Sequence, residues 1–305
     1  MPRNDYQASK DSCPATFPSD ASTKTWAWSS TSLRAVDLEF AIRSDNPRLG
    51  RYLDSIFLSQ RSGGPASAEI FVVAGGPDAG SGGWDIFVDT KPRCRSLRAG
   101  EVVPALLAEI NTEVIRASSA RHVLLHASGA AQDDRCAIFH APPEAGKTTL
   151  VAGLVLAGLK YVTDEAVALD LESRLIRPFP KPLSIDPGAW PVLEALRPSL
   201  DDDLAEWAVD QWHVEPGSIR PDAVAGPCRP TFVVSTRYAS GARTRLHAVH
   251  RADALTNLMN NAFETNRRDV SMFNIVSAMV REAECYELVV GDLTQACELV
   301  LAMFE

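Results

Sequence analysis

The sequence predicts an α/β protein whose core is of βαβ type and follows a small α+β domain. Two observations predict this fold class. Around residues 135–163 an apolar strand pattern, a glycine-containing loop, an apolar helix pattern and a second strand pattern follow one another. Between residues 25 and 100, short apolar runs alternate with turns rich in glycine and proline, which is typical of a separate unit containing β-strands.

The loop between the first strand and the helix has the composition of a phosphate-binding loop. Ala141 to Thr148 matches the pattern G-x-x-x-x-G-K-[ST] except at its first glycine. In such loops backbone N–H groups and a helix N-terminus surround nucleotide phosphates, the lysine neutralises charge and the hydroxyl binds Mg²⁺. We therefore expect ATP and Mg²⁺ as cofactors, with these residues at the nucleotide: Ala141, Glu144, Ala145, Gly146, Lys147, Thr148 and Thr149.

Besides Ala141, three residues of this loop depart from the usual composition. Pro142 and Pro143 remove two N–H donors, although the donors from the second half of the loop remain. Glu144 places a carboxylate near anionic phosphates, where many such loops have glycine. The alternative interpretation is a helix-capping turn that only resembles a nucleotide loop.

The elements around the loop place two acidic residues at the site. The apolar run 135–140 predicts a buried strand, 148–157 predicts a helix that ends at Gly158, and 159–163 predicts the second strand. Asp164 and Glu165 then follow the carboxyl end of this strand, which is where ligands bind in open α/β sheets.

From His126 to about Asp186, the chain resembles the HPr kinase/phosphorylase family, and more closely its smaller relatives that phosphorylate precursor peptides of natural-product clusters. His126 precedes Ala141 by fifteen residues and Asp164 follows Lys147 by seventeen, as the family's histidine and acidic pair do. The segment 177–185, Arg-Pro-Phe-Pro-Lys-Pro-Leu-Ser-Ile, also looks like the proline-rich basic stretch of the smaller relatives.

The resemblance implies a role for each candidate residue. Lys147 would hold the β- and γ-phosphates, and Thr148 would supply an oxygen to Mg²⁺. Asp164 would take or orient the proton of the acceptor hydroxyl and is also a candidate metal ligand, while Glu165 would hold Mg²⁺ directly or through water. Because adjacent side chains of a strand point in opposite directions, the two carboxylates are not expected to share one role. His126 would lie near the acidic pair as a third catalytic residue.

Each of these assignments has a structural alternative. An acidic pair at the end of a strand is often a solvated turn. His126 follows an apolar run and has the pattern of a core histidine. Lys181, between Pro180 and Pro182, is a candidate for contact with phosphate or peptide, and its alternative is a solvated charge in a loop.

Composition restricts the class of protein. The chain has 305 residues, is 46% hydrophobic and has a formal net charge of −9, which argues against nucleic acid or an anionic membrane as partner. It contains no apolar run of membrane-spanning length and no signal-peptide core, so we expect a cytoplasmic protein. Its six cysteines are scattered and show no metal-ligand spacing, which favours reduced thiols.

The rest of the chain divides into three expected parts. Residues 1–24 are polar and rich in Ser, Asp and Pro, and we expect a disordered tail. Residues 25–100 form the small N-terminal domain, with a helix near 48–57. Residues 101–305 form the kinase-like domain with the phosphate-binding loop, so the boundary is placed near residue 100.

Two regions of the second domain invite a functional interpretation. The interval 211–230 is rich in proline and glycine and carries Trp212 and His213. It is either a lid or an insertion packed by Trp212. Helical periodicity from 251 to 282 is broken by a polar stretch at 266–269, and the pattern then predicts a strand at 285–290 and a helix at 293–304.

Together these features predict an ATP-dependent kinase that transfers the γ-phosphate to a Ser or Thr hydroxyl of a small protein or precursor peptide. Two alternatives stay open, namely a kinase for a small hydroxylated metabolite and a catalytically weak, nucleotide-binding partner subunit. Some relatives form hexamers, so a homo-oligomer is one expected state, but nothing in the sequence fixes it.

Overall fold

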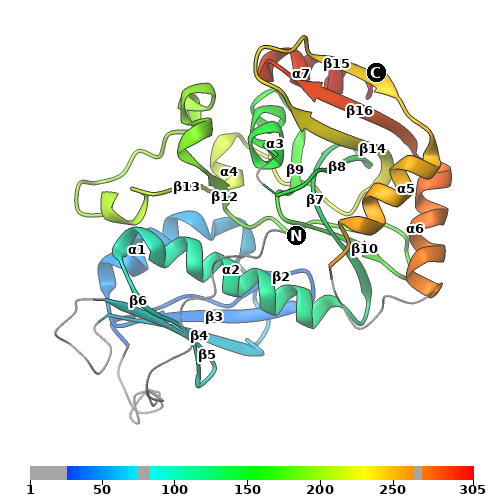
Figure 1. Cartoon of the computed structure of the whole chain (residues 1–305). Helices are drawn as coiled ribbons and strands as arrows, with labels where there is room; N and C mark the ends of the chain where they lie inside the picture. Colours follow the sequence, from blue (N-terminus) through cyan, green and yellow to red (C-terminus); the bar gives the residue numbers. More distant parts are fainter. Residues whose placement is uncertain (1–25, 75–82, 144, 264–269) are drawn as a thin grey trace.

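The computed structural model describes residues 26–74, 83–143, 145–263 and 270–305. The chain forms a mixed α/β structure with two large sheets (Figure 1). The expected tail at 1–24 and the polar break at 266–269 lie outside the described residues. Within them, no helix is both long and apolar enough to cross a membrane.

The first sheet belongs to the N-terminal part of the chain. Its strand order is β1-β3-β4-β5-β6, with β2 paired to β3, and β3 and β4 are its parallel pair. The strands are β1 (Trp28–Ser29), β2 (Leu33–Ala35), β3 (Leu38–Ser44), β4 (Ala68–Ala74), β5 (Trp84–Val88) and β6 (Lys91–Leu97). Between β3 and β4 lie α1 (Pro47–Ile56), which begins where the Asn46 side chain accepts two backbone N–H bonds, and a 3-10 turn (Leu58–Gln60).

The long helix α2 (Ala99–Ser118) packs on this first sheet. Val103, Leu106 and Ile110 of α2 share one buried cluster with Phe40 and Ile42 of β3. Helix α2, which follows the expected boundary near residue 100, therefore packs with the N-terminal core, and the second sheet starts at residue 122. An apolar helix face does not itself indicate which of two sheets it will cover.

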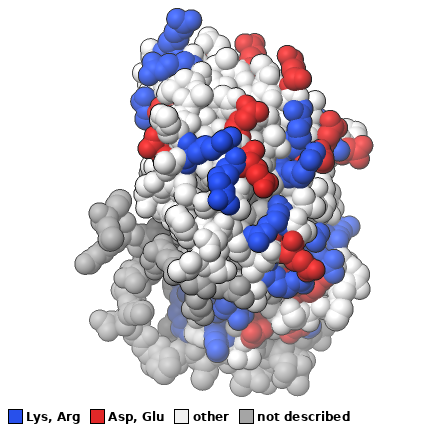
Figure 2. Space-filling model, turned by 90° about the vertical axis from the view of Figure 1, so that its right-hand side faces the viewer, with Lys and Arg blue, Asp and Glu red and all other residues white. Residues whose placement is uncertain are grey.

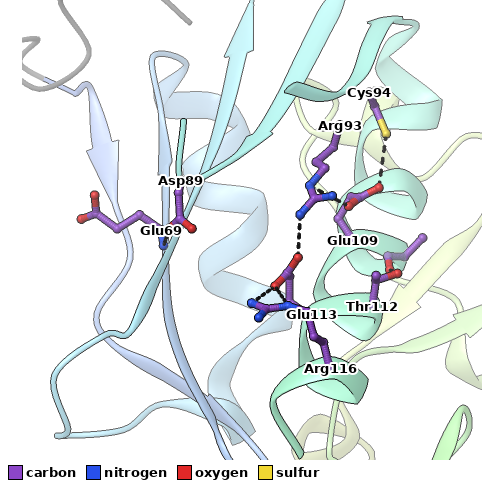
Figure 3. Close-up of polar contacts among 9 residues, drawn as sticks. Glu69, Asp89, Arg93, Cys94, Glu109, Thr112, Glu113 and Arg116 are labelled. Atoms are coloured by element: carbon purple, nitrogen blue, oxygen red, sulfur yellow. Dashed lines mark hydrogen bonds and ion pairs between the residues drawn. The ribbon is translucent and has the colours of Figure 1, made fainter. Parts of the chain in front are cut away.

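Charged side chains add a second connection between α2 and the first sheet (Figure 3). The Arg93 guanidinium of β6 lies 2.8 Å from the Glu113 carboxylate of α2, whose side chain is only 2% exposed. Arg116, one turn further along α2, pairs with the same carboxylate. Glu113 therefore has two positively charged partners that offset the cost of its burial.

The second sheet carries the predicted loop. Its order is β11-β10-β7-β8-β14-β16-β15, with β9 also paired to β7. The strands are β7 (His122–Gln132), β8 (Arg135–His140), β9 (Lys160–Thr163), β10 (Ala166–Asp170), β11 (Ile176–Arg177), β14 (Arg229–Tyr238), β15 (Arg245–Ala248) and β16 (Glu284–Val290). Helices α3 (Lys147–Leu156) and α7 (Leu293–Leu301) pack in one buried cluster, and α5 (Arg251–Asn260) and α6 (Val270–Glu282) pack in another. The two pairs cover opposite faces of the sheet (Figure 1).

The predicted βαβ unit is β8, α3 and β9, and β7 lies between its two strands. β7 is antiparallel to both, with its second half paired to β8 on one side and to β9 on the other. Its first half pairs with β10, so β9 and β10 follow one another along the same edge of β7. Asp164 and Glu165 form the interruption between β9 and β10.

The interval 211–230 is a packed insertion, which was the second of its two interpretations. β13 (Trp212–Val214) pairs with β12 (Leu183–Ile185), and the short helix α4 (Pro216–Ile219) follows. The Trp212 ring stacks on Trp190 at a centroid distance of 4.8 Å and an interplanar angle of 4°. Trp190 belongs to a 3-10 helix (Pro187–Val192), and two more such turns follow at Glu194–Leu196 and Ala205–Trp207.

The segment between β12 and β14 packs against the N-terminal part of the chain. Trp84 of β5 meets Trp207 edge to face at 4.9 Å, and Trp207 is fully buried. The Glu215 carboxylate accepts backbone N–H bonds from Leu58 and Ser59 of the N-terminal part. On the surface, basic and acidic side chains alternate over the face seen in Figure 2.

Candidate functional site

The predicted phosphate-binding loop leads from β8 directly into α3. Gly146 is the residue before the helix and has φ 81°, a left-handed conformation that glycine adopts without strain. No side chain of the described residues caps this end of α3, so the N–H groups of its first turn and the positive end of its dipole point into the loop. The Lys147 ammonium donates to the backbone oxygens of Ala141 at 3.0 Å and Pro142 at 3.1 Å. Glu144 lies outside the described residues.

Burial and charge set the protonation of two residues beside the loop. Burial lowers the pKa of Lys147, and the carboxylates of Glu165 and Asp164 act in the opposite direction. Burial, together with the neighbouring Lys147 charge, lowers the pKa of His140 to about 4. His140 at the end of β8 is therefore neutral at pH 7 and adds no positive charge to the loop.

Asp164 lies beside the first turn of α3 and is surrounded by polar partners. Its Oδ1 accepts the Tyr161 hydroxyl at 2.7 Å and lies 2.8 Å from the Lys181 ammonium. Its Oδ2 lies 3.4 Å from the Thr148 hydroxyl oxygen and 3.4 Å from the Ser184 backbone nitrogen. The side chains of Asp164 and Lys181 are 1% and 2% exposed, so Lys181 is not the solvated loop charge of the alternative interpretation.

Glu165 faces a different environment from its neighbour. Its Oε1 lies 3.4 Å from Nδ1 of His126, and the two side chains are 31% and 26% exposed. Burial alone would raise the pKa of Glu165, but the His126 contact and the charges of Lys181 and Lys147 outweigh it and lower this pKa. His126 also meets the Phe263 ring edge to face at 5.5 Å. Glu165 is thus a carboxylate at neutral pH with a histidine at its side.

The structure therefore brings together, at one end of α3, the loop lysine and hydroxyl, both acidic residues, His126 and Lys181. The donor set suits an ATP-bound Mg²⁺ ion, because a hydroxyl and a carboxylate oxygen 3.4 Å apart, Thr148 and Asp164, are oxygen donors of the kind this ion prefers. Within the described ranges no three His, Cys, Asp or Glu side chains form a metal cluster. Mg²⁺ commonly uses one or two carboxylates together with phosphates and water.

Sequence reasoning missed two residues of this site and gave a third, His213, no separate role. Tyr161 lies three positions before Asp164, and only the break between β9 and β10 turns its hydroxyl toward that carboxylate. Ser184 comes from β12 and contributes through its backbone, which leaves no signal in the sequence. His213 is paired with Ser184 across β12 and β13, and it was seen in the sequence but assigned to the interval 211–230 as a whole.

Comparisons with known proteins add little to this geometry. No protein-family model and no curated protein matches the chain. Among solved structures, the chain is similar to the Hpr(Ser) kinase/phosphatase from Coxiella burnetii, at 12% sequence identity over 59% of this chain and 95% of that one. The TM-score is 0.29, and a likeness at this level carries no argument for fold or function.

Proposed function

We propose that this protein is an ATP-dependent kinase of the HPr-kinase type, which transfers the γ-phosphate to a Ser or Thr hydroxyl of a small protein or precursor peptide. The observation that carries the proposal is the convergence on one helix end of a loop lysine, a Thr148–Asp164 pair and a Glu165–His126 pair. Phosphoryl transfer needs charge neutralisation, alignment and a proton acceptor, and this group of residues offers all three.

The loop and Asp164 serve the phosphates and the metal. The N–H groups at the start of α3 bind the phosphate oxygens, and Lys147 turns from the carbonyls of Ala141 and Pro142 toward the β- and γ-phosphates. Thr148 and Asp164 would hold Mg²⁺, which would supply positive charge to the phosphates. This use of Asp164 fits its burial, because its carboxylate is turned toward the helix and away from solvent.

Glu165 serves the acceptor hydroxyl. Its carboxylate is the more exposed of the two and has His126 beside it, so an incoming hydroxyl can reach it. The main roles expected from the resemblance are thereby exchanged, with Asp164 at the metal and Glu165 at the proton. A carboxylate with a lowered pKa is a weak base, but it can still orient the acceptor hydroxyl and accept its proton as the phosphoryl group is transferred.

The acceptor class rests on the sequence resemblance between His126 and about Asp186. We infer a hydroxyl on a peptide or small protein because the resemblance is stronger to the precursor-peptide kinases than to other relatives.

The test is transfer of label from [γ-³²P]ATP with Mg²⁺ into candidate peptides encoded beside the gene. We expect label on Ser or Thr with wild type, and loss of label in Lys147→Ala, Asp164→Asn and Glu165→Gln. Lys91→Ala, an exposed lysine of β6, is the control for loss of a positive charge. If the label enters a small metabolite and not a peptide, the proposed peptide acceptor is wrong and the protein is a metabolite kinase. ATP binding without any transfer would favour the non-catalytic partner subunit.

A further inference from the structure

The Asp164 carboxylate is part of a buried polar network that reaches the N-terminal part of the chain. Two short contacts, from the Tyr161 hydroxyl and the Lys181 ammonium, are both made to Oδ1. Among the described residues, Oδ2 has two longer contacts, to Thr148 and to the Ser184 nitrogen. Oδ1 is therefore fixed by the protein, while Oδ2 faces the loop and is left for a cation.

His213 connects this carboxylate to helix α1. It is paired with Ser184 in the two-stranded sheet of β12 and β13, so it lies beside the residue whose N–H points to Asp164. Its Nδ1 lies 2.9 Å from the Tyr52 hydroxyl of α1, and both side chains are buried. In Figure 1, β12 lies between α3 and the N-terminal helices. The Tyr52 hydrogen bond, the pairing of β13 with β12 and the longer Ser184 contact thus connect α1 to Asp164.

The surroundings of His213 keep this connection rigid. Burial and the nearby Lys181 charge lower the pKa of His213 to about 3, so its ring is neutral at pH 7. Its Nε2 is buried and has no hydrogen-bond partner among the described residues, which leaves the Tyr52 hydroxyl as the contact that orients the ring. Loss of that hydroxyl would leave both ring nitrogens without a partner, and reorientation of the ring would disturb the paired Ser184.

We propose that Tyr161 and Lys181 are positioning residues that aim Asp164 at the metal, and that Tyr52, acting through His213, makes the N-terminal part a determinant of metal affinity. The inference rests on the proposed function, because it assumes a divalent cation between Thr148 and Asp164. Residues that orient a metal ligand from behind typically contribute 10- to 100-fold to metal affinity. Tyr52 acts through two further contacts, so its contribution is smaller.

The experiment measures Mn²⁺ binding by electron paramagnetic resonance in the presence of saturating ADP, and ADP binding in EDTA by calorimetry. Neither measurement depends on turnover. We expect Tyr161→Phe to weaken Mn²⁺ binding by roughly 10- to 100-fold and Tyr52→Phe to weaken it by about 3-fold, since one neutral hydrogen bond is lost at a distance. ADP affinity in EDTA should remain at the wild-type value in both. Tyr238→Phe, at a tyrosine that is 60% exposed, is the matched control and should change neither.

The outcomes distinguish a role in positioning Asp164 from a general role in keeping the site folded. Wild-type Mn²⁺ affinity in Tyr161→Phe and Tyr52→Phe would overturn the proposal, and so would an equal loss of ADP affinity in EDTA, which would indicate general disruption of the site. Tyrosine-to-phenylalanine changes keep the ring, so the test does not rely on Lys181→Met, which leaves a buried carboxylate without its cation. If wild type binds Mn²⁺ and ADP but transfers no phosphate, the proposed function fails while the positioning result stands. If wild type binds neither ligand, both fail.

Discussion

The buried pair of Lys181 and Asp164 makes a sharp prediction about stability. The two charged atoms are 2.8 Å apart, and the side chains are 2% and 1% exposed. Removing one partner of such a pair leaves an uncompensated charge in the interior and costs about 3–5 kcal/mol. Lys181→Met should therefore lower the free energy of unfolding by about this amount, because Met keeps most of the apolar side chain but cannot neutralise Asp164.

A double-mutant cycle isolates the pair from other effects of the substitutions. Asp164→Asn alone should also destabilise, since it leaves the Lys181 ammonium buried without an anion. The double variant should be less destabilised than the sum of the two, with a coupling free energy of about 2 kcal/mol or more. Urea unfolding, followed by the fluorescence of the chain's six tryptophans, measures the change in the free energy of unfolding for each single variant and for the double variant.

The exposed pair of Glu194 and Arg197 is the matched control. Its atoms are 3.3 Å apart and its side chains are 62% and 69% exposed, so the same cycle with Glu194→Gln and Arg197→Met should give less than about 1 kcal/mol. If the Lys181 and Asp164 variants were additive and each cost less than about 1 kcal/mol, the pair would be hydrated in solution. The argument that Lys181 fixes Oδ1 would then be refuted.

Three further predictions concern single residues. The pKa values of His213 and His140 are lowered to about 3 and about 4, so the unfolded chain takes up protons at these residues more readily than the folded one. Stability should be unaffected by them above about pH 6.5 and should fall below it, by about 2 kcal/mol for each histidine at pH 5. Urea unfolding at pH 7 and pH 5 would measure this loss, and His213→Gln should reduce it by about half. Gly146→Ala should lower the free energy of unfolding by about 1 kcal/mol and weaken ADP binding, because an alanine is strained at the φ of 81°. A steric clash does not contribute, since the added Cβ would have no atom within 4 Å. Wild-type values in thermal unfolding and calorimetry would show that the loop does not need glycine there. Glu165→Gln should reduce phosphoryl transfer by about 100-fold or more while ADP affinity is retained, and a transfer rate near wild type would remove Glu165 as the proton acceptor.

Elements with a strong local pattern were predictable from the sequence. The strand at 135–140, the helix after the loop and the strand at 285–290 all occur in the structure within one or two residues of the expected bounds. Their apolar periodicity reflects burial, which a local window of sequence records. The packing of α2 on the first sheet was not predictable in this way, because periodicity indicates that a helix face is buried and does not indicate which sheet it packs on. The insertion of β7 between β8 and β9 likewise depends on pairing between distant segments.

The same division between local and distant information applies to the site. The spacing of the loop, the acidic pair and His126 lies within about forty residues and was read directly. Lys181 stands between two prolines, as an exposed loop charge would, and its burial follows only from its contact with Asp164. The Tyr52 and His213 contact joins residues 161 positions apart, and neither residue carries a pattern that indicates the other.

The acidic pair shows how far a local rule extends toward function. Alternation along a strand indicated that Asp164 and Glu165 face different surroundings, and the structure agrees with that geometry. Alternation places the two side chains on opposite sides, however, and does not indicate which of the two carboxylates faces the metal. That choice depends on the surroundings of each carboxylate. Tyr161 and Lys181 contact Asp164 and bury it, whereas Glu165 has His126 beside it and is partly exposed to solvent. A fixed carboxylate suits a metal ion, whereas an accessible one beside a histidine suits a proton, so the environments and not the order of the two residues support the assignment of roles.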